Sequence, residues 1–321
     1  MRDGTILVVL SRIEQQLPTM AYRLKAKESL STGIKRIATE QIEKATSELN
    51  NADGIGVGEA VHQARKRFKK IRAVIRLVRH SLGKKTYKQE NKHFRNLGRS
   101  IADLRDGEVL IETLDNLTTR FEDEVTSDFT HIRRELRVDY RQQYQRIIDK
   151  DILVSVIDEL KDSTKKINAW KIKSNDWSAM DKSFRQVYKR GYKDLDRVIS
   201  KPTAENLHEW RKRIKYLRYQ LQILSPMWSS LIKQWVDLTH DLTDYLGEDH
   251  DLAVLKEYLL NQPERFDREN NLEMLISLCD RRQKKLQSAA ISLGKKIYTE
   301  KPQHYSDRFG NYWQVWQESN S

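Results

Sequence analysis

The chain has 321 residues and a formal net charge of +13, from 59 Lys and Arg against 46 Asp and Glu. Only 12 Gly and 5 Pro interrupt it, which favours long helices and argues against a sandwich, a barrel or a collagen-like protein. Its one cysteine, Cys279, excludes an internal disulfide, and its longest apolar run, residues 6–10, is too short to span a bilayer or to form an export signal. These features favour a cytoplasmic protein without a membrane span.

Apolar residues recur at spacings of three and four along most of the chain, and the alternating pattern of strands is rare. This periodicity predicts an all-α fold. In chain order, the predicted helices are 21–50, 59–82, 86–120, 127–149, 153–167, 180–200, 204–224, 229–260 and 267–298. The last twenty residues are expected to be loosely ordered, although Tyr312, Trp313 and Trp316 are able to dock on the body.

The most informative feature is an internal repeat. The segment VHQARKRFKKIR at residues 61–72 corresponds to LHEWRKRIKYLR at residues 207–218, with a constant offset of 146. Further along, LRDGEVL at residues 104–110 corresponds to DHDLAVL at residues 249–255, with an offset of 145. The chain therefore divides into an N-terminal extension (1–20), a first helical repeat (21–150), a linker helix region (151–178), a second helical repeat (179–300) and a C-terminal tail (301–321).

Each copy of the repeated helix carries an apolar seam beside a row of cations. In the first copy the seam begins with Val61, Ala64 and Phe68, at the spacing of a helix in a bundle. The residues that follow the seam positions, about 100° further around the helix, are basic. We call these two sets the basic stripes. The first stripe is His62, Arg65, Lys69, Arg72, Arg76 and Arg79, and the second is His208, Arg211, Lys215 and Arg218.

The basic stripes lack the mixed charges of an ordinary solvated helix. Residues 60–89 contain eleven Lys and Arg and no Asp or Glu, whereas opposite charges three or four residues apart usually stabilise exposed helices. The alternative is that the cations pair with carboxylates on neighbouring helices, and the repetition of the stripe in register argues against it. Arg offers paired hydrogen bonds to phosphate and Lys a mobile charge. Two stripes facing each other about a pseudo-twofold axis would therefore suit an extended polyanion.

The repeated motifs resemble those of a known family, the CHAD domain, or conserved histidine α-helical domain. The resemblance rests on His62-x-x-Arg65-Lys66-x-x-Lys69-x-x-Arg72, on its second copy at residues 208–218, and on the Leu-Arg-Asp and His-Asp-Leu segments. It covers about residues 24–297, and it implies two four-helix bundles related by internal pseudo-twofold symmetry around a central basic pore. The resemblance also implies that this pore binds inorganic polyphosphate.

Some relatives carry a second domain before the CHAD domain, the triphosphate-tunnel domain with a Glu-x-Glu-x-Lys signature. Here the one Glu-x-Glu is Glu122-Asp123-Glu124, which Thr126 follows in place of Lys. The chain is therefore expected to be a stand-alone member of the family.

The resemblance assigns binding residues position by position. The polyphosphate-binding residues that it implies are His62, Arg65, Lys66, Lys69, Arg72, Arg76, His208, Arg211, Lys212, Lys215 and Arg218. The second copy departs from this pattern at Gln222 and Ser225, which stand opposite Arg76 and Arg79, so that end is expected to bind more weakly.

Two further pairs of repeated residues lie beside the stripes. The histidines His62 and His208 either donate a hydrogen bond to phosphate as neutral imidazoles or fasten the start of their helix to a neighbour. The acids Asp106 and Asp251 are expected to hold basic side chains of the stripes in their binding rotamers. The segment 248–251 offers carboxylates and an imidazole to a metal, but consecutive helical residues point in different directions, so no metal is expected.

Three functions compete for this sequence. The first is a non-enzymatic module that binds polyphosphate and targets the protein to polyphosphate-rich granules. The alternative is a nucleic-acid-binding basic helical protein, although no nucleic-acid motif is recognised and no aromatic residues are interleaved within the stripes. The third, a phosphatase, requires a general base or a metal aimed at the substrate. No cofactor is expected, because the glycine-rich loop 54–58 lacks the Gly-Lys-Ser ending of a phosphate loop.

Overall fold

The computed structural model describes residues 22–124, 128–148, 151–267 and 271–320, without the side chains of 103–106 and 146–148. These residues form helices joined by short turns, and no strand occurs among them, so the all-α prediction is confirmed. The N-terminal extension, residues 1–20, lies outside the described part of the chain. No helix within the described part is both long and apolar enough to cross a membrane.

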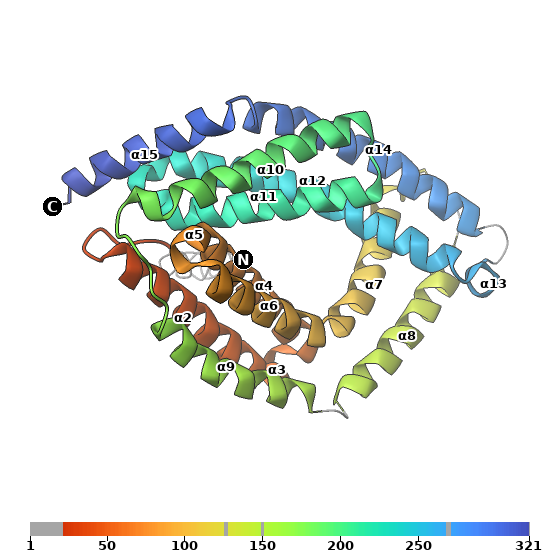
Figure 1. Cartoon of the computed structure of the whole chain (residues 1–321). Coiled ribbons are helices and arrows are strands. Elements are labelled where there is room, and N and C mark those ends of the chain that lie inside the picture. Colours follow the sequence, from red (N-terminus) through yellow and green to blue (C-terminus); the bar gives the residue numbers. More distant parts are fainter. Residues whose placement is uncertain (1–21, 125–127, 149–150, 268–270, 321) are drawn as a thin grey trace, which may run out of the picture.

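The first half of the chain forms a series of helices whose starts follow from local sequence (Figure 1). Ser29 caps the first of them, because its hydroxyl accepts a hydrogen bond from the Thr32 N–H at 3.1 Å. Gly56 and Gly83, both with positive φ, precede two others, a conformation that glycine adopts without steric cost. The helices are α2 (Leu30–Asn50), α3 (Ala52–Ile55), α4 (Val57–Leu77), α5 (Arg79–Leu82), α6 (Lys84–Ser100), α7 (Asp103–Arg120), α8 (Thr130–Ile148) and α9 (Ile152–Asn168).

The second half begins with a short 3₁₀ turn and continues with longer helices. Thr203 caps the helix that carries the second basic stripe, since its hydroxyl accepts a hydrogen bond from the Asn206 N–H at 3.3 Å. The elements are η1 (Trp177–Ala179), α10 (Asp181–Ser200), α11 (Ala204–Leu224), η2 (Ser225–Trp228), α12 (Ser229–Leu260), α13 (Pro263–Phe266), α14 (Asn271–Ile297) and α15 (Pro302–Glu318).

Two predicted helices are divided in the structure. The predicted helix 59–82 is interrupted at Val78, between α4 and α5. The periodicity predicts a single helix over 86–120, but α6 ends at Ser100 and α7 begins at Asp103. The corresponding part of the second half, α12, is continuous over 32 residues. No proline stands at the break between α6 and α7, so local sequence does not announce it. Its carbonyl at Ala102 accepts a hydrogen bond from Arg65 Nη1 at 2.9 Å, which ties the break to the first basic stripe.

The C-terminal segment is helical, and the expectation that it is loosely ordered is wrong. Helix α15 packs on α10. It buries Tyr305, Phe309, Trp313 and Trp316, at the spacing of three and four residues that places side chains on one helix face. Tyr305 stacks on Tyr188 of α10 with ring centroids 3.8 Å apart. Burial of these aromatic side chains is a large apolar contribution that orders the segment.

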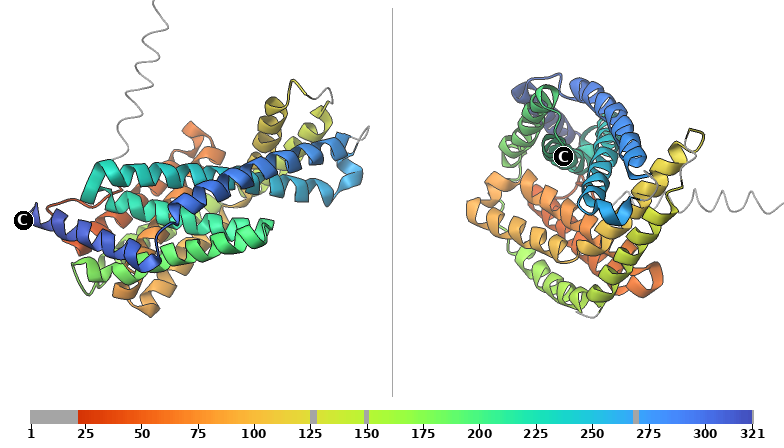
Figure 2. Two further views of the ribbon diagram at one scale, coloured as in Figure 1. Left: turned by 90° about the horizontal axis from the view of Figure 1, so that it is seen from above. Right: turned by 90° about the vertical axis from the view of Figure 1, so that its right-hand side faces the viewer.

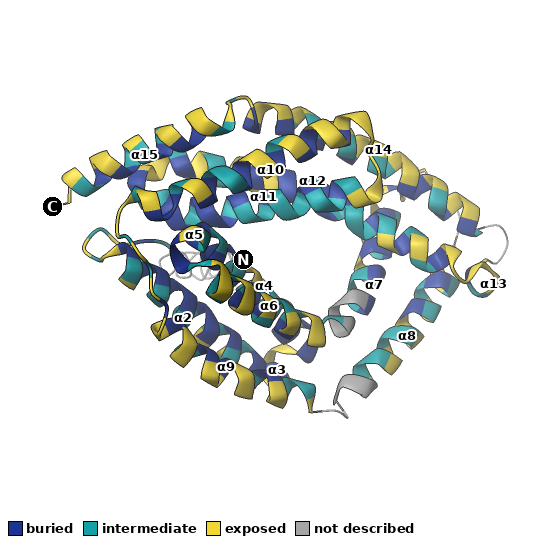
Figure 3. Cartoon of the chain, viewed as in Figure 1, coloured by how far each residue is buried: buried dark blue, intermediate teal, exposed yellow. Residues whose placement is uncertain are grey.

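The main core joins helices from both halves. In the first half α9, α2, α4 and α6 pack in that spatial order, and in the second half α15, α10, α11, α12 and α14 do so. Helices α4 and α11 meet where the two series join (Figure 1). Buried residues follow the faces on which helices meet, and α11 shows many residues of intermediate burial (Figure 3). The helices that carry the basic stripes therefore lie at the centre of the molecule.

A second core crosses the boundary between the repeats. Leu114 of α7 and Ile132 of α8 lie in one apolar cluster with Leu255 of α12 and Leu275 of α14. Figure 2 shows the yellow helices α7 and α8 alongside the blue ends of α12 and α14. Helix α7 also packs on α4. The first half thus extends two helices onto the second half, and the boundary near residue 150 is not a division between separate cores.

Candidate functional site

The two stripe helices bury their apolar seams as predicted. Every seam residue from Val61 to Leu82, along α4 and into α5, is buried, and so is every seam residue of α11 from Leu207 to Leu224. With the seams turned inward, the stripe residues flank the contact between α4 and α11. Most of them are half-buried, whereas Lys69 is exposed, as is the neighbouring Lys66 of the implied binding set.

Arg72 and Arg76 of the first stripe are positioned by neutral partners. Arg72 Nε and Arg76 Nη1 both donate hydrogen bonds to the side-chain oxygen of Asn91 on α6, at 3.2 and 2.6 Å. Arg76 Nη2 also donates to the Tyr216 hydroxyl of α11 at 3.2 Å, and its guanidinium lies 4.1 Å from the centre of that ring. Arg65 donates to the Ala102 carbonyl as described above. These contacts orient the guanidiniums without neutralising their charge.

The second stripe has fewer polar contacts and deeper burial. Arg211 lies over Gly247 of α12, where an added Cβ would approach its Nη2 to 3.0 Å. The Nε atoms of Arg211 and Arg218 are buried and have no hydrogen-bond partner among the described residues. Arg218 Nη1 lies 3.5 Å from the Thr243 hydroxyl. Buried donors of this kind are costly unless a ligand or water satisfies them.

Three basic residues beside the stripes have carboxylate partners, as the alternative interpretation of the stripes requires. Lys212 of the implied binding set pairs with Glu209 on the same helix. Arg67 pairs with Glu48 at 2.6 Å, and its counterpart Arg213 pairs with Glu209 at 3.1 Å and with Asp194 at 3.3 Å. The carboxylate-paired face of each helix is therefore distinct from the stripe.

Burial and like charge lower the pKa of several lysines where α4 meets α11. Burial, followed by the charges of Arg211 and Lys69, lowers the pKa of Lys215 well below its usual range. Burial lowers the pKa of Lys70 to about 7, and Arg67, Lys66, Lys44 and Arg218 add to the effect. Such a concentration of cations disfavours the charged form of each lysine, and a bound anion would favour it.

Lys70 was not among the residues expected in the site. It was missed because its counterpart in the second copy is Tyr216, so the position is not repeated. The basic run Lys69-Lys70 was the available signal. The backbone carbonyl of Lys70 accepts a hydrogen bond from the Tyr22 hydroxyl at 2.8 Å, and the Lys70 ammonium lies 4.6 Å from the centre of the Tyr22 ring.

The histidine of the second stripe lies against another histidine. The rings of His208 and His250 are 4.2 Å apart between centroids, and His208 Nδ1 is buried without a hydrogen-bond partner among the described residues. Burial and the nearby cations lower the pKa of His208, and they lower the pKa of His250 to about 3. Both imidazoles are therefore neutral near pH 7. His62 is half-buried on α4.

The acids near the stripes point to different neighbours. Burial lowers the pKa of Arg211 and Lys215. The negative charge of Asp251 raises the pKa of both residues and so favours their charged forms. Glu248 pairs with Arg282 at 2.6 Å, and Asp249 accepts a hydrogen bond from Gln287 at 2.8 Å. No group of three or more metal-ligating side chains occurs in the described part of the chain. The side chain of Asp106 lies outside the described residues.

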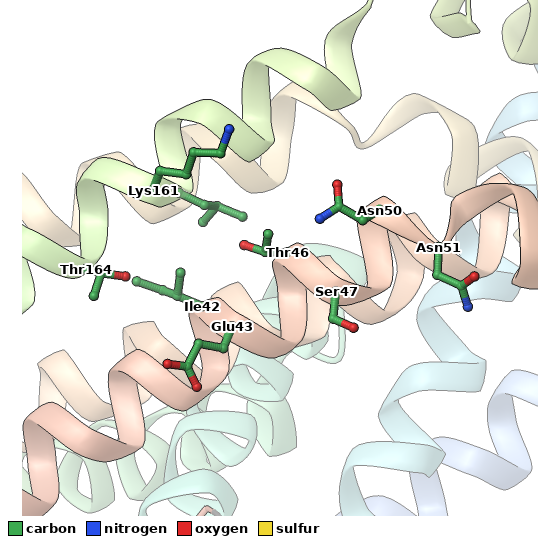
Figure 4. A pocket seen from close by; sticks show the side chains of 9 residues that line it. Ile42, Glu43, Thr46, Ser47, Asn50, Asn51, Lys161 and Thr164 are labelled. Carbon is green, nitrogen blue, oxygen red and sulfur yellow. The ribbon is translucent and has the colours of Figure 1, made fainter.

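Of two pockets in the described part of the chain, one lies away from the stripes and the other at the end of the first stripe. An open groove of about 640 Å³ lies between α2 and α9, with Glu43 and Lys161 as its ionisable residues (Figure 4). Because one acid and one base line it, this groove does not favour a polyanion. A small cavity of about 20 Å³ lies at the far end of the first stripe, between Arg76, Arg79, Arg190 and Arg213. A cavity of that size holds about one water molecule.

Comparison with known proteins relates this architecture to one family. The family model for the CHAD domain matches residues 36–260. The crystal structure of the CHAD domain from the plant Ricinus communis superposes with a TM-score of 0.63 and 14% identity, covering 88% of this chain and 95% of that one. PptA from Streptomyces chartreusis superposes with a TM-score of 0.60 and 10% identity, covering 85% and 100%. A search of curated proteins found no match. The chain belongs to the CHAD domain family.

Proposed function

We propose that this protein binds inorganic polyphosphate, without catalysis, between the basic stripes of α4 and α11. The observation that carries the proposal is the approach of the stripes where the helices meet. The pKa of Lys215, already lowered by burial, is lowered further by Lys69, and Arg218 adds to the burial that lowers the pKa of Lys66. Facing like charges destabilise the folded protein, and a bound polyanion relieves that repulsion.

The contacts between the helices support a twofold relation of the halves. The offset of 146 relates Arg72 to Arg218 and Lys70 to Tyr216. Tyr216 influences the pKa of Arg72, and Arg218 influences the pKa of Lys70, so each pair spans the two helices in a corresponding way. The pair of Lys69 and Lys215 is exchanged with itself. Lys69 and Lys215 therefore lie near the proposed axis, and a central basic pore would run along the stripes.

Polyphosphate fits this surface better than a single phosphate does. The stripe positions Arg65 to Arg76 span eleven residues, about 16 Å of helix at a rise of about 1.5 Å per residue. An extended anion is needed to meet cations along that length. Asp251 acts on Arg211 and Lys215, an arrangement that suits positioning of these cations and not abstraction of a proton. Recruitment to polyphosphate-rich granules would follow from such binding.

The double variant Arg65→Gln with Arg211→Gln tests the proposal. These side chains occupy corresponding positions of the two stripes. Loss of two charge-assisted hydrogen bonds, each worth about 1.5–3 kcal/mol, is expected to weaken polyphosphate binding by at least about 100-fold.

Arg67→Gln with Arg213→Gln is the matched control. It removes the same charge from the same two helices, on the face that pairs with Glu48, Asp194 and Glu209. We expect this control to bind within about threefold of the wild type, because these cations are already neutralised. Circular dichroism establishes that both variants are folded. Equal loss of affinity in the two variants would contradict a site at the stripes.

A further inference from the structure

The helices that flank the two basic stripes differ in charge at corresponding positions, and at two of these positions the charges are opposite. Helix α6 packs against α4, and helix α12 packs against α11. The offset of 145, which relates the later segments of the two repeats, also relates α6 to the first part of α12. The corresponding residues are Lys92 with Asp237, Arg95 with His240 and Arg99 with Asp244.

Burial shows that this correspondence is structural. Three pairs of corresponding residues lie between or just after these charged positions, and all six residues are buried. The pairs are Phe94 with Thr239, Leu97 with Leu242 and Ile101 with Leu246. Because the buried positions coincide, the charged positions lie on equivalent faces of α6 and α12.

On the first half, cations surround the middle of the stripe. Arg72 and Arg76 share the neutral side chain of Asn91. After burial and the opposing effect of Tyr216, the charges of Arg76 and Arg95 lower the pKa of Arg72. Lys92 and Arg99 of α6 are exposed, and add further positive charge to the helix that packs on α4.

On the second half, carboxylates surround the corresponding arginine. Burial lowers the pKa of Arg218, and the charges of Asp237 and Asp244 raise it. Asp244 raises the pKa of Arg211 in the same way. Both carboxylates are exposed. His240 Nδ1 lies 2.8 Å from Asp244. An anion that approaches Arg218 therefore meets two negative charges that have no counterpart beside Arg72.

We infer that the two sides of the site are unequal, and that polyphosphate is held mainly by α4 and α6, through Arg72 with the flanking Lys92, Arg95 and Arg99. Asp237 and Asp244 weaken the side formed by α11 and α12, because they repel the phosphate chain and compete with it for Arg218. This inference rests on the proposed function, and adds which half of the site provides the affinity.

The loss of one arginine on each side gives the first test. Arg72→Gln and Arg218→Gln remove the same charge from equivalent positions of the two stripes. Titration with long-chain polyphosphate should show about a tenfold loss for Arg72→Gln and at most about a threefold loss for Arg218→Gln, as expected for a charge-assisted contact and a partly neutralised one.

The second test seeks a gain of affinity. Asp237→Lys with Asp244→Arg gives α12 the charges of α6, and should tighten polyphosphate binding about tenfold and steepen its salt dependence. The control is Asp158→Lys with Asp162→Arg on α9, which packs on α2. These acids are exposed and pair with lysines on their own helix, and the substitutions change the net charge equally.

The outcomes separate the inference from the proposed function. If the wild-type protein fails to bind polyphosphate, the proposed function is wrong and the inference falls with it. If the wild type binds, equal losses for Arg72→Gln and Arg218→Gln, or a gain in the α12 variant no larger than that in the α9 control, would overturn the inference alone. Unequal losses together with a gain specific to α12 would support it.

Discussion

The half-buried Lys70 should make the folded protein less stable than a neutral side chain of the same length would. Its pKa falls from the usual 10.5 to about 7, chiefly because of burial. One pKa unit corresponds to about 1.36 kcal/mol, so below pH 7 the buried charge costs the folded state up to about 5 kcal/mol. Because water and neighbouring groups relax around such a charge, we expect about 2 kcal/mol in practice. Lys70→Met should therefore raise the free energy of unfolding by that amount at pH 6.

The same reasoning gives the pH dependence of this gain. Between pH 7 and 10.5 the unfolded chain binds the Lys70 proton more tightly than the folded protein does, so wild-type stability rises with pH. The variant lacks this group, and its advantage over the wild type should shrink steadily as the pH rises from 7 to 9.5.

Urea denaturation at pH 6, 7.5 and 9.5 measures this difference. Lys88→Met, at an exposed position of α6, is the control and should change stability little. A Lys70→Met protein that is less stable than the wild type at pH 6, or an advantage that does not vary with pH, would refute the reasoning.

Three further predictions concern the proton uptake of Lys70 and the packing around two glycines. Polyphosphate binding near pH 8 should take up protons, because an anion beside Lys70 raises a pKa that is otherwise about 7; calorimetry in buffers of different ionisation enthalpy measures the uptake, and heats that do not vary with the buffer would contradict it. Gly294→Ala should lower the free energy of unfolding by about 2 kcal/mol, since its Cβ would lie 2.5 Å from the buried indole of Trp210. Gly98→Ala, where the nearest side-chain atom would be 3.8 Å away, should raise it by about 0.5 kcal/mol. Denaturation of both variants checks the opposite signs, and a shared sign would show that the packing around α11 is misassigned.

The parts of the fold that could be predicted from the sequence are those with a local signal. The repeat places Phe68 and Ile214 at corresponding seam positions, and both are buried in the structure. The bounds of α11 and α12 coincide with the predicted helices, because capping residues and a proline mark the junctions around them. Helical periodicity depends only on residues close together in the chain, so a single sequence is enough to predict it.

The rest depends on contacts between residues distant in the chain. Nothing near Leu114 indicates that α7 and α8 share a core with Leu255 of α12 instead of closing on their own half. The docking of Trp313 and Trp316 was anticipated, but the ordered helix was not, because the apolar side chains of α15 need the partner surface of α10 to become ordered. In the site, Asn91 lies on a helix without the repeated motif, and its hydrogen bonds to Arg72 and Arg76 exist only once α6 packs on α4.

The central claim is that the basic stripes form a specific site for polyphosphate. The most direct test is calorimetric titration of the protein with long-chain polyphosphate at physiological salt, repeated with excess single-stranded and double-stranded nucleic acid. The account predicts tight binding that nucleic acid does not displace. Weak binding, or displacement by nucleic acid at comparable phosphate concentration, would show that the surface attracts polyanions in general, and would contradict the claim.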